Sequence, residues 1–326
     1  MKVAVSIVAG ADETMVLRCL ETLFDTSRGS GLDLDVTVVE NQTGRALVAR
    51  LHERFPDLHV VENTGARGFA ANHNSVLRRV TAPYALILND DVEFLDDAVT
   101  AMVLFMQHPD QARVAVVSPK LLNSDRTLQP STYAFPTLSR ALLDVSGLRT
   151  WVPVSSRLFR LAHALGAGAG RSRYWAHDRT CDVDTLRGAC VLVRLAAARE
   201  VGLMDETTIV GGEETEWHRR FREHGWRVVF LAEASVVHVG GQTVARNRLL
   251  RVEYFKGYLN YFRRHPGGIR YVTFAALALA VYGVRYALAV LRRARLERRE
   301  SALGVRTAWR WLVAAEREAV GFPRMA

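Results

Sequence analysis

Residues 84–93 read Tyr-Ala-Leu-Ile-Leu-Asn-Asp-Asp-Val-Glu, and this stretch decides the fold of the chain. Its first five residues form an unbroken apolar run, which is typical of a strand buried on both faces of a parallel sheet. Three carboxylates follow within four residues, at Asp90, Asp91 and Glu93. An acidic cap for a following helix accounts for one carboxylate but explains three poorly. We therefore expect a central strand with a functional site at its carboxyl end.

The first 120 residues alternate short β-branched runs with amphipathic segments. The runs predict strands, and the segments between them have helical spacing. Strands are expected at 3–8, 34–39, 58–61, 84–88 and 114–117, and helices at 13–24, 45–55, 70–80 and 96–107. This βαβ series predicts an α/β fold with a mostly parallel sheet, whose ligand lies beyond the carboxyl ends of the strands.

The composition of the chain indicates one α/β domain with a smaller extension, since 326 residues are 49% apolar. Its cysteines (Cys19, Cys181 and Cys190) are widely spaced and match neither a disulfide framework nor a zinc site. Residues 1–8 lack the apolar stretch of a signal peptide. We expect a protein of the reducing cytoplasm.

The net charge of +9 belongs to the end of the chain. Residues 249–326 contain 15 basic and 5 acidic side chains, whereas residues 1–248 contain 28 basic and 29 acidic ones. The near-neutral first part argues against a nucleic-acid footprint. We expect no nucleic-acid partner.

Polar residues follow the second predicted strand, while the first is followed by Ala-Gly-Ala-Asp at 9–12. That segment lacks the G-x-G-x-x-G of a nicotinamide-binding fold, which is therefore disfavoured. Glu40 and Asn41 end the second strand and suit a ribose hydroxyl or a base edge. A capped turn before the next helix is the alternative for them.

A glycine-containing loop follows the third predicted strand, reading Asn-Thr-Gly-Ala-Arg-Gly-Phe-Ala-Ala-Asn at 63–72. Its glycines, Gly68 among them, allow the backbone to bend and to approach a ligand. Arg67 suits a phosphate, and Asn63 and Asn72 offer amide contacts. A plain loop without a ligand is the competing interpretation.

The carboxylates after the fourth strand predict a divalent metal site. Hard oxygen ligands suit Mg²⁺ or Mn²⁺, which bind one or two carboxylates together with substrate phosphate oxygens. The ion would bridge the protein and a diphosphate.

At this point the sequence resembles glycosyltransferase family 2, and its rhamnosyltransferase-like branch most closely. The likeness rests on Val-Val-Glu-Asn at 38–41, the glycine loop from Asn63 to Asn74 and Leu-Asn-Asp-Asp-Val at 88–92. Further motifs follow in the expected order, with Arg-Gly-Ala-Cys at 187–190, Gly-Glu-Glu-Thr-Glu-Trp-His-Arg-Arg at 212–220 and Val-Val-His-Val-Gly-Gly at 236–241. The resemblance covers about residues 3–243 and implies a GT-A type, Rossmann-like fold.

The resemblance implies a role for each matching residue. Asp91 matches the metal-binding aspartate, and His238 matches the histidine that completes the metal site. Asn89 replaces the first aspartate of the usual Asp-x-Asp, as is common in this branch. Glu214 stands where the family has its catalytic aspartate, and Glu213 is the alternative base. A solvated carboxylate that suits the helix dipole is the simpler interpretation of Glu214.

The remaining implications concern the substrates. The nucleotide sugar would contact Asn89, Asp90, the loop at Gly188 and the residues after strands two and three. We expect an inverting, metal-dependent transfer from a dTDP- or UDP-linked sugar, with rhamnose favoured, to a lipid-linked or cell-envelope glycan. The alternatives are a soluble natural-product acceptor, a catalytically silent membrane-associated relative and, more weakly, a sugar nucleotidyltransferase.

Two domains are predicted. Residues 1–243 form a GT-A domain, with a nucleotide-sugar half (1–120) and an acceptor and catalytic half (121–243). Residues 244–326 form a basic helical tail. Residues 271–291 contain a single charge, Arg285, and are long enough to span a bilayer. Alanines and that arginine weaken a spanning interpretation. We expect a helical appendage lying on the anionic inner face of the cell membrane. A soluble cap or a homodimer face is the alternative.

Overall fold

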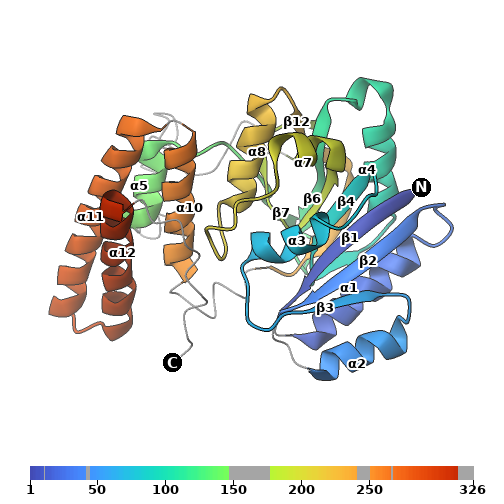
Figure 1. The fold of residues 1–326 in the computed structure, drawn as a ribbon, viewed down its shortest axis with the longest axis horizontal. Coiled ribbons are helices and arrows are strands. Elements are labelled where there is room, and N and C mark those ends of the chain that lie inside the picture. The colour runs from blue at the N-terminus through green and yellow to red at the C-terminus, as the bar shows by residue number, and fades with distance from the viewer. Residues whose placement is uncertain (11, 42–44, 147–176, 241–249, 266, 315–326) are drawn as a thin grey trace. The chain divides into compact units, whose positions relative to one another are not determined.

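The computed structural model describes residues 1–10, 12–41, 45–146, 177–240, 250–265 and 267–314 (Figure 1). The chain forms two compact units, and each is described by itself. The first unit comprises Met1–Tyr133, Ser172–Glu206 and Trp217–Gly241, and the second comprises Ala134–Arg171, Thr207–Glu216 and Gln242–Ala326. The units interleave along the sequence, whereas the predicted domains 1–243 and 244–326 are contiguous. The assignment of separate functions to residues 1–243 and 244–326 stays a prediction.

The first unit contains a mixed sheet in the order β3-β2-β1-β4-β11-β6-β12-β5. The strands from β3 to β4 are parallel, β11 is antiparallel to both its neighbours, β6 and β12 are parallel, and β5 is antiparallel to β12. The strands of this path are β1 (Lys2–Ala9), β2 (Asp33–Glu40), β3 (His59–Glu62), β4 (Tyr84–Asn89), β5 (Val92–Phe94), β6 (Val114–Leu122), β11 (Cys190–Arg194) and β12 (Arg227–His238).

Short strands extend this sheet and form a second one. β7 (Leu128–Gln129) pairs with β6, and β9 (Cys181–Asp182) pairs with β12. β8 (Thr132–Tyr133) and β10 (Thr185–Leu186) form a separate two-stranded sheet. The β6–β7 connection is a hairpin, closed by the bond from the Asn123 N–H to the Thr127 carbonyl.

Helices cover both faces of the large sheet, because successive strand residues point to opposite sides. Val3, Val5 and Ile7 pack into one core with α1 and α4, while Ala4 packs into the other with α7 and α8. The helices are α1 (Glu13–Thr26), α2 (Arg45–Arg54), α3 (Phe69–Leu77), α4 (Ala98–Gln107), η1 (Pro109–Gln111), α7 (Leu195–Val201) and α8 (Glu213–Glu223), the last of which begins in the second unit. The predicted mostly parallel sheet flanked by helices is confirmed.

The second unit is built from helices that pack side by side (Figure 1). They are α5 (Leu138–Ser146), α10 (Arg251–Arg264), α11 (Gly268–Leu291) and α12 (Arg295–Ala314). Their core holds aromatic side chains such as Phe255, Phe274 and Trp311. This helical region confirms the predicted C-terminal appendage, while α5 comes from the range predicted as the acceptor and catalytic half.

Helix α11 is long and apolar enough to cross a membrane, judged by length and composition, although core helices of soluble proteins pass the same test. The apolar side chains of α11 differ in burial, because Phe274 is fully buried in the helical core whereas Leu277, Val284, Leu288 and Leu291 are exposed.

Candidate functional site

Strand pairing brings Asp91 and His238 together. His238 ends β12 and pairs with Val92 of β5, and the Val239 N–H donates to the Asp91 carbonyl at 3.0 Å. Oδ1 of Asp91 then lies 3.3 Å from Nε2 of His238, while Oδ2 accepts a hydrogen bond from the Gly240 N–H at 2.9 Å. Two residues 147 positions apart in the sequence thus share one edge of the sheet.

Gln129 fixes the state of the His238 ring. Nδ1 of His238 lies 2.6 Å from Oε1 of Gln129, and Nε2 of Gln129 donates to the His238 carbonyl at 2.9 Å. Because the amide nitrogen is used on a carbonyl, its oxygen faces the ring and accepts from Nδ1–H. Nε2 of the neutral ring therefore carries the lone pair, and it also lies 3.3 Å from Nδ2 of Asn89. This second contact makes Nε2 an acceptor and agrees with the same tautomer.

These residues fit a divalent cation. Oδ1 of Asp91 is buried and accepts no hydrogen bond within the described residues, and it faces the Nε2 lone pair of His238. Burial acts to raise the pKa of Asp91, but the attraction of a protonated His238 ring and the Gly240 N–H outweigh it, so the pKa lies below its usual value. The Nε2 lone pair faces Oδ1 only in the neutral ring, which is the form that binds a metal ion. A carboxylate and an imidazole oriented by an amide suit Mn²⁺ or Mg²⁺. Among the described residues, no cluster of three or more His, Cys, Asp or Glu side chains occurs, so a diphosphate would supply further ligands.

Asp90 points to a different partner. Its Oδ2 accepts a hydrogen bond from the Gly10 N–H, which joins the ends of β4 and β1. Burial raises the pKa of Asp90 to about 7. A β-carbon at Gly10 would lie 3.0 Å from this carboxylate oxygen, so the glycine permits the close contact. Asp90 thus stabilises the loop after β1, and its contact with a nucleotide stays a prediction.

Three amides predicted as ligand contacts bond to one another. Nδ2 of Asn63 donates to Oδ1 of Asn41 at 3.2 Å and to Oδ1 of Asn72 at 2.8 Å. Oδ1 of Asn41 also accepts from the Arg67 N–H at 2.9 Å, and Nδ2 of Asn72 donates to the Arg67 carbonyl at 3.1 Å. The amides therefore hold the backbone of the glycine loop at Arg67. Glu40 ends β2 directly before this network and is buried.

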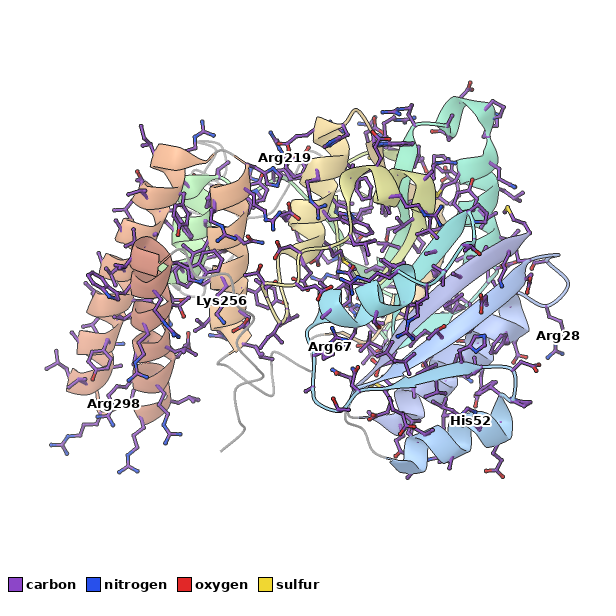
Figure 2. All side chains as sticks on the ribbon, in the orientation of Figure 1. Arg28, His52, Arg67, Arg219, Lys256 and Arg298 are labelled. Carbon is purple, nitrogen blue, oxygen red and sulfur yellow. The ribbon has the colours of Figure 1, made fainter. Side chains whose placement is uncertain are left out.

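The Arg67 side chain lies beside a carboxylate. Its Nη2 is 3.9 Å from Oε2 of Glu206, whose Oε1 is held by Arg78 and by Nδ2 of Asn74 at 2.9 Å. These bonds hold the pKa of Glu206 below its usual value against the opposing effect of burial. Arg67 is 43% exposed, so it is available to a phosphate (Figure 2). Gly68 caps α3 with φ −69°, so backbone strain is not the reason for a glycine there.

The loop at Gly188 leads into β11 next to Asn89, whose N–H donates to the Ala189 carbonyl at 2.8 Å. The preceding Arg187 was not singled out by the sequence. Its Nη2 donates to the Tyr133 hydroxyl at 2.7 Å, and its Nη1 lies 3.5 Å from Oε1 of Gln129. A cation therefore borders the amide that orients His238. The Arg-Gly pair at 187–188 was the available signal for it.

Glu213 and Glu214 belong to the second unit, at the start of α8. Glu213 is 3% exposed, and burial together with the charge of Glu214 raises its pKa well above the usual value. Glu214 is half-buried. Glu216, on the same turn, is buried with its carboxylate 3.2 Å from Nε2 of His265. Of the two candidate bases, Glu214 is the more accessible to an acceptor.

Helix α10 holds the segment that carries this pair. Oε2 of Glu253 accepts from the Ile209 N–H at 3.2 Å, and Glu253 is paired with Lys256 at 2.7 Å. A β-carbon at Gly257 would lie 2.2 Å from the Gly211 carbonyl oxygen, so only glycine allows this approach. The sequence offered no signal that α10 supports the carboxylates.

Comparison with known proteins identifies the family. The Glycosyltransferase like family 2 profile matches residues 2–264, and the chain belongs to this family. The chain is 23% identical over 230 residues, or 70% of its length, to the O-antigen biosynthesis protein RfbC of Myxococcus xanthus. It spans only 16% of the length of that relative. The expected family is thus confirmed, while the rhamnosyltransferase-like branch stays a prediction.

Solved structures share the fold. The mannosyltransferase PcManGT from Pyrobaculum calidifontis, in complex with GDP-Man and Mn²⁺, matches with a TM-score of 0.51 and 16% identity, over 96% of this chain and 88% of its own. GalNAc-T7 with UDP, GalNAc and Mn²⁺ matches with a TM-score of 0.52 and 13% identity, over 81% of this chain and 50% of its own. The fold is therefore of the GT-A type, as expected.

Proposed function

We propose that the protein is an inverting, metal-dependent glycosyltransferase that moves a sugar from a nucleotide diphosphate to a hydroxyl group of a glycan acceptor. One observation carries the proposal: Asp91 and an oriented Nε2 of His238 meet at a strand edge in a chain of this family. Mn²⁺ or Mg²⁺ bound there would supply positive charge that stabilises the departing diphosphate. Asp91 and His238 would hold the ion.

The residues of the chain have distinct roles in this mechanism. Arg67, fixed by the three amides, neutralises phosphate charge as the diphosphate leaves. Glu214 takes the proton of the acceptor hydroxyl while the oxygen attacks the anomeric carbon, and the bond to the diphosphate oxygen breaks on the opposite face. Single displacement inverts the anomeric configuration. Nδ2 of Asn89 lies 3.3 Å from Nε2 of His238, so its amide would have to leave that atom for an ion to bind there.

The donor and acceptor are proposed from resemblance to relatives. A dTDP- or UDP-linked, rhamnose-like sugar is favoured by branch resemblance, and the relative named for O-antigen biosynthesis favours a lipid-linked or cell-envelope glycan. A soluble natural-product acceptor is the alternative. Of the neighbouring structures, one carries GDP-Man and the other UDP with GalNAc, so the base and sugar require direct measurement.

The decisive experiment measures donor binding and hydrolysis in the purified protein. A panel of dTDP-, UDP- and GDP-sugars is tested by thermal shift and by release of nucleotide diphosphate, with Mn²⁺, with Mg²⁺ and with a chelator. We expect one donor class to bind and to hydrolyse slowly only with metal. Binding without hydrolysis or transfer to any glycan would favour the catalytically silent relative. The reason to test this alternative is that Asn89 and Glu214 stand where the family usually has aspartates.

A further inference from the structure

We propose that α11 and α12 form a docking surface for an anionic lipid bilayer, with α11 lying in the plane of the membrane rather than crossing it. The inference does not depend on the donor, the acceptor or the catalytic residues. It would place the enzyme at the surface where a lipid-linked acceptor is presented. Helices α11 and α12 form a helical hairpin, which begins after residue 264, where the match to the family ends.

The exposed face of α11 is apolar along its whole length. Large side chains on this face are Ile269 at 85% exposure, Val272 at 53%, Leu277 at 45%, Val284 at 61%, Leu288 at 42% and Leu291 at 78%. Tyr286 and Val290 are exposed as well, small residues fill further positions, and Arg270 is the only charged residue among the exposed positions of α11. A continuous exposed apolar face of this kind marks an interaction surface.

The opposite face of α11 is packed and makes polar contacts, which argues against a spanning helix. The rings of Phe274 and Tyr282 pack at a tilt against Phe255, with centroid distances of 5.8 and 5.1 Å. Arg285 donates to the Val145 carbonyl at 2.7 Å and pairs at 2.8 Å with Glu300, which is 1% exposed. A span would carry these charges and the paired helices into hydrocarbon, which is costly. Only the outer face is free to enter lipid.

The charge of α12 selects the kind of membrane. Every exposed charged residue on this helix is an arginine, whereas Glu297 is half-buried and Glu300 is buried. The exposed arginines are Arg295, Arg298, Arg299, Arg306 and Arg310, with Arg292 and Arg293 in the preceding turn. Figure 2 labels Arg298 on this helix. Trp309, 58% exposed, lies among them and suits the headgroup level. Basic residues beside an apolar face are the pattern of an interfacial helix on anionic lipid.

The same charge disfavours a second copy as the occupant. In a two-fold dimer each partner contributes the same patch, so two arginine-rich hairpins would face each other. No exposed acidic side chain of α11 or α12 in the described residues offsets that repulsion. Anionic lipid, by contrast, supplies the complementary charge.

The test is co-sedimentation of the full chain with phosphatidylcholine vesicles and with vesicles that also contain phosphatidylglycerol. We expect binding only to the anionic vesicles, reduced by salt and released by alkaline carbonate. R298E/R299E/R306E and, separately, V284E/L291E should each weaken binding at least about tenfold. The controls are Arg28→Glu and Leu104→Glu in the first unit. The Arg28 side chain is 82% exposed, and Leu104 is 61% exposed. Circular dichroism checks that each variant is folded.

Three results would overturn the inference. Equal binding to neutral and anionic vesicles would remove the role of the arginines. Resistance to carbonate extraction would indicate a spanning helix. A concentration-dependent dimer that V284E/L291E abolishes, without vesicle binding by the parent chain, would assign the face to a second copy.

Discussion

Nδ1 of His238 lies 2.6 Å from Oε1 of Gln129, and this contact decides which ring nitrogen faces Asp91. Gln129 is anchored in turn, because its Nε2 donates to the His238 carbonyl and to Oδ1 of Asn123 at 3.0 Å. Loss of a residue that orients a metal-binding histidine commonly lowers metal affinity by roughly 10- to 100-fold. Gln129 therefore belongs to the candidate metal site although it would not touch the ion.

Gln129→Ala should weaken Mn²⁺ binding by about 10- to 100-fold in the presence of nucleotide diphosphate. The ring would lose the acceptor that holds Nδ1–H and populate the other tautomer. Isothermal titration with Mn²⁺ measures the change. Gln107→Ala, an exposed glutamine on α4, is the control. Wild-type Mn²⁺ affinity in Gln129→Ala would mean that His238 does not bind the ion through Nε2.

Asp91→Ala should abolish metal-dependent binding of nucleotide diphosphate while the protein stays folded. The substitution removes the buried oxygen that faces His238, and no third carboxylate or imidazole clusters with this pair in the described residues. Fluorescence titration with and without Mn²⁺ measures the effect. Asp110→Ala, with its side chain 82% exposed, is the control. Unchanged affinity in Mn²⁺ would exclude Asp91 from the metal site.

The metal-free protein should lose stability as the pH rises from about 4 to about 7 through the buried Asp90. Its pKa is raised by burial, so the folded state binds more protons than the unfolded state across this window, and the free energy of unfolding falls with rising pH. Asp90→Asn should flatten this part of the profile. Chemical denaturation in chelator across the window provides the measurement. An identical slope in both proteins would contradict the burial of an ionisable carboxyl.

Gly257→Ala should lower turnover more than donor affinity. Its β-carbon would lie 2.2 Å from the Gly211 carbonyl oxygen, so the segment before Glu213 has to move. Overpacking of this kind costs about 1–3 kcal/mol of stability. Gly283→Ala on α11 is the matched control, since nothing lies within 4 Å of its added carbon. Turnover numbers measure the effect on catalysis, and thermal melts measure the effect on stability. Normal turnover in Gly257→Ala would mean that α10 does not position the carboxylates.

The sequence predicts the framework because its signals are local. The apolar run before Asn89 and the polar residues after each strand indicate which edge of the sheet is polar, and parallel pairing then aligns Ala9, Glu40 and Glu62. Gln129 is different. The β6–β7 hairpin brings Gln129 to His238, 109 positions away in the sequence. Hydrophobic periodicity does not predict a contact between residues so far apart.

Side-chain partners are harder to predict than strand ends. Asn41, Asn63 and Asn72 have the composition of ligand contacts, yet their amides satisfy one another and the backbone at Arg67. An amide both donates and accepts, so its type alone does not reveal whether a ligand or the chain is its partner. In α11, Phe274 is buried and Leu277 is exposed, and helical periodicity alone does not state which neighbour covers which side.

Glu214→Gln should reduce turnover by roughly 10² to 10⁴, the usual contribution of a general base, with little change in donor binding. Glutamine keeps the size of the side chain and its hydrogen bonds but cannot take the acceptor's proton. Steady-state transfer and a donor titration give the two quantities. Glu213→Gln is the informative control, because burial and the neighbouring charge already favour the protonated form of Glu213. That variant should therefore lose less activity. A larger loss at Glu213 would move the base by one residue, and near-normal rates in both variants would require a base from elsewhere in the chain.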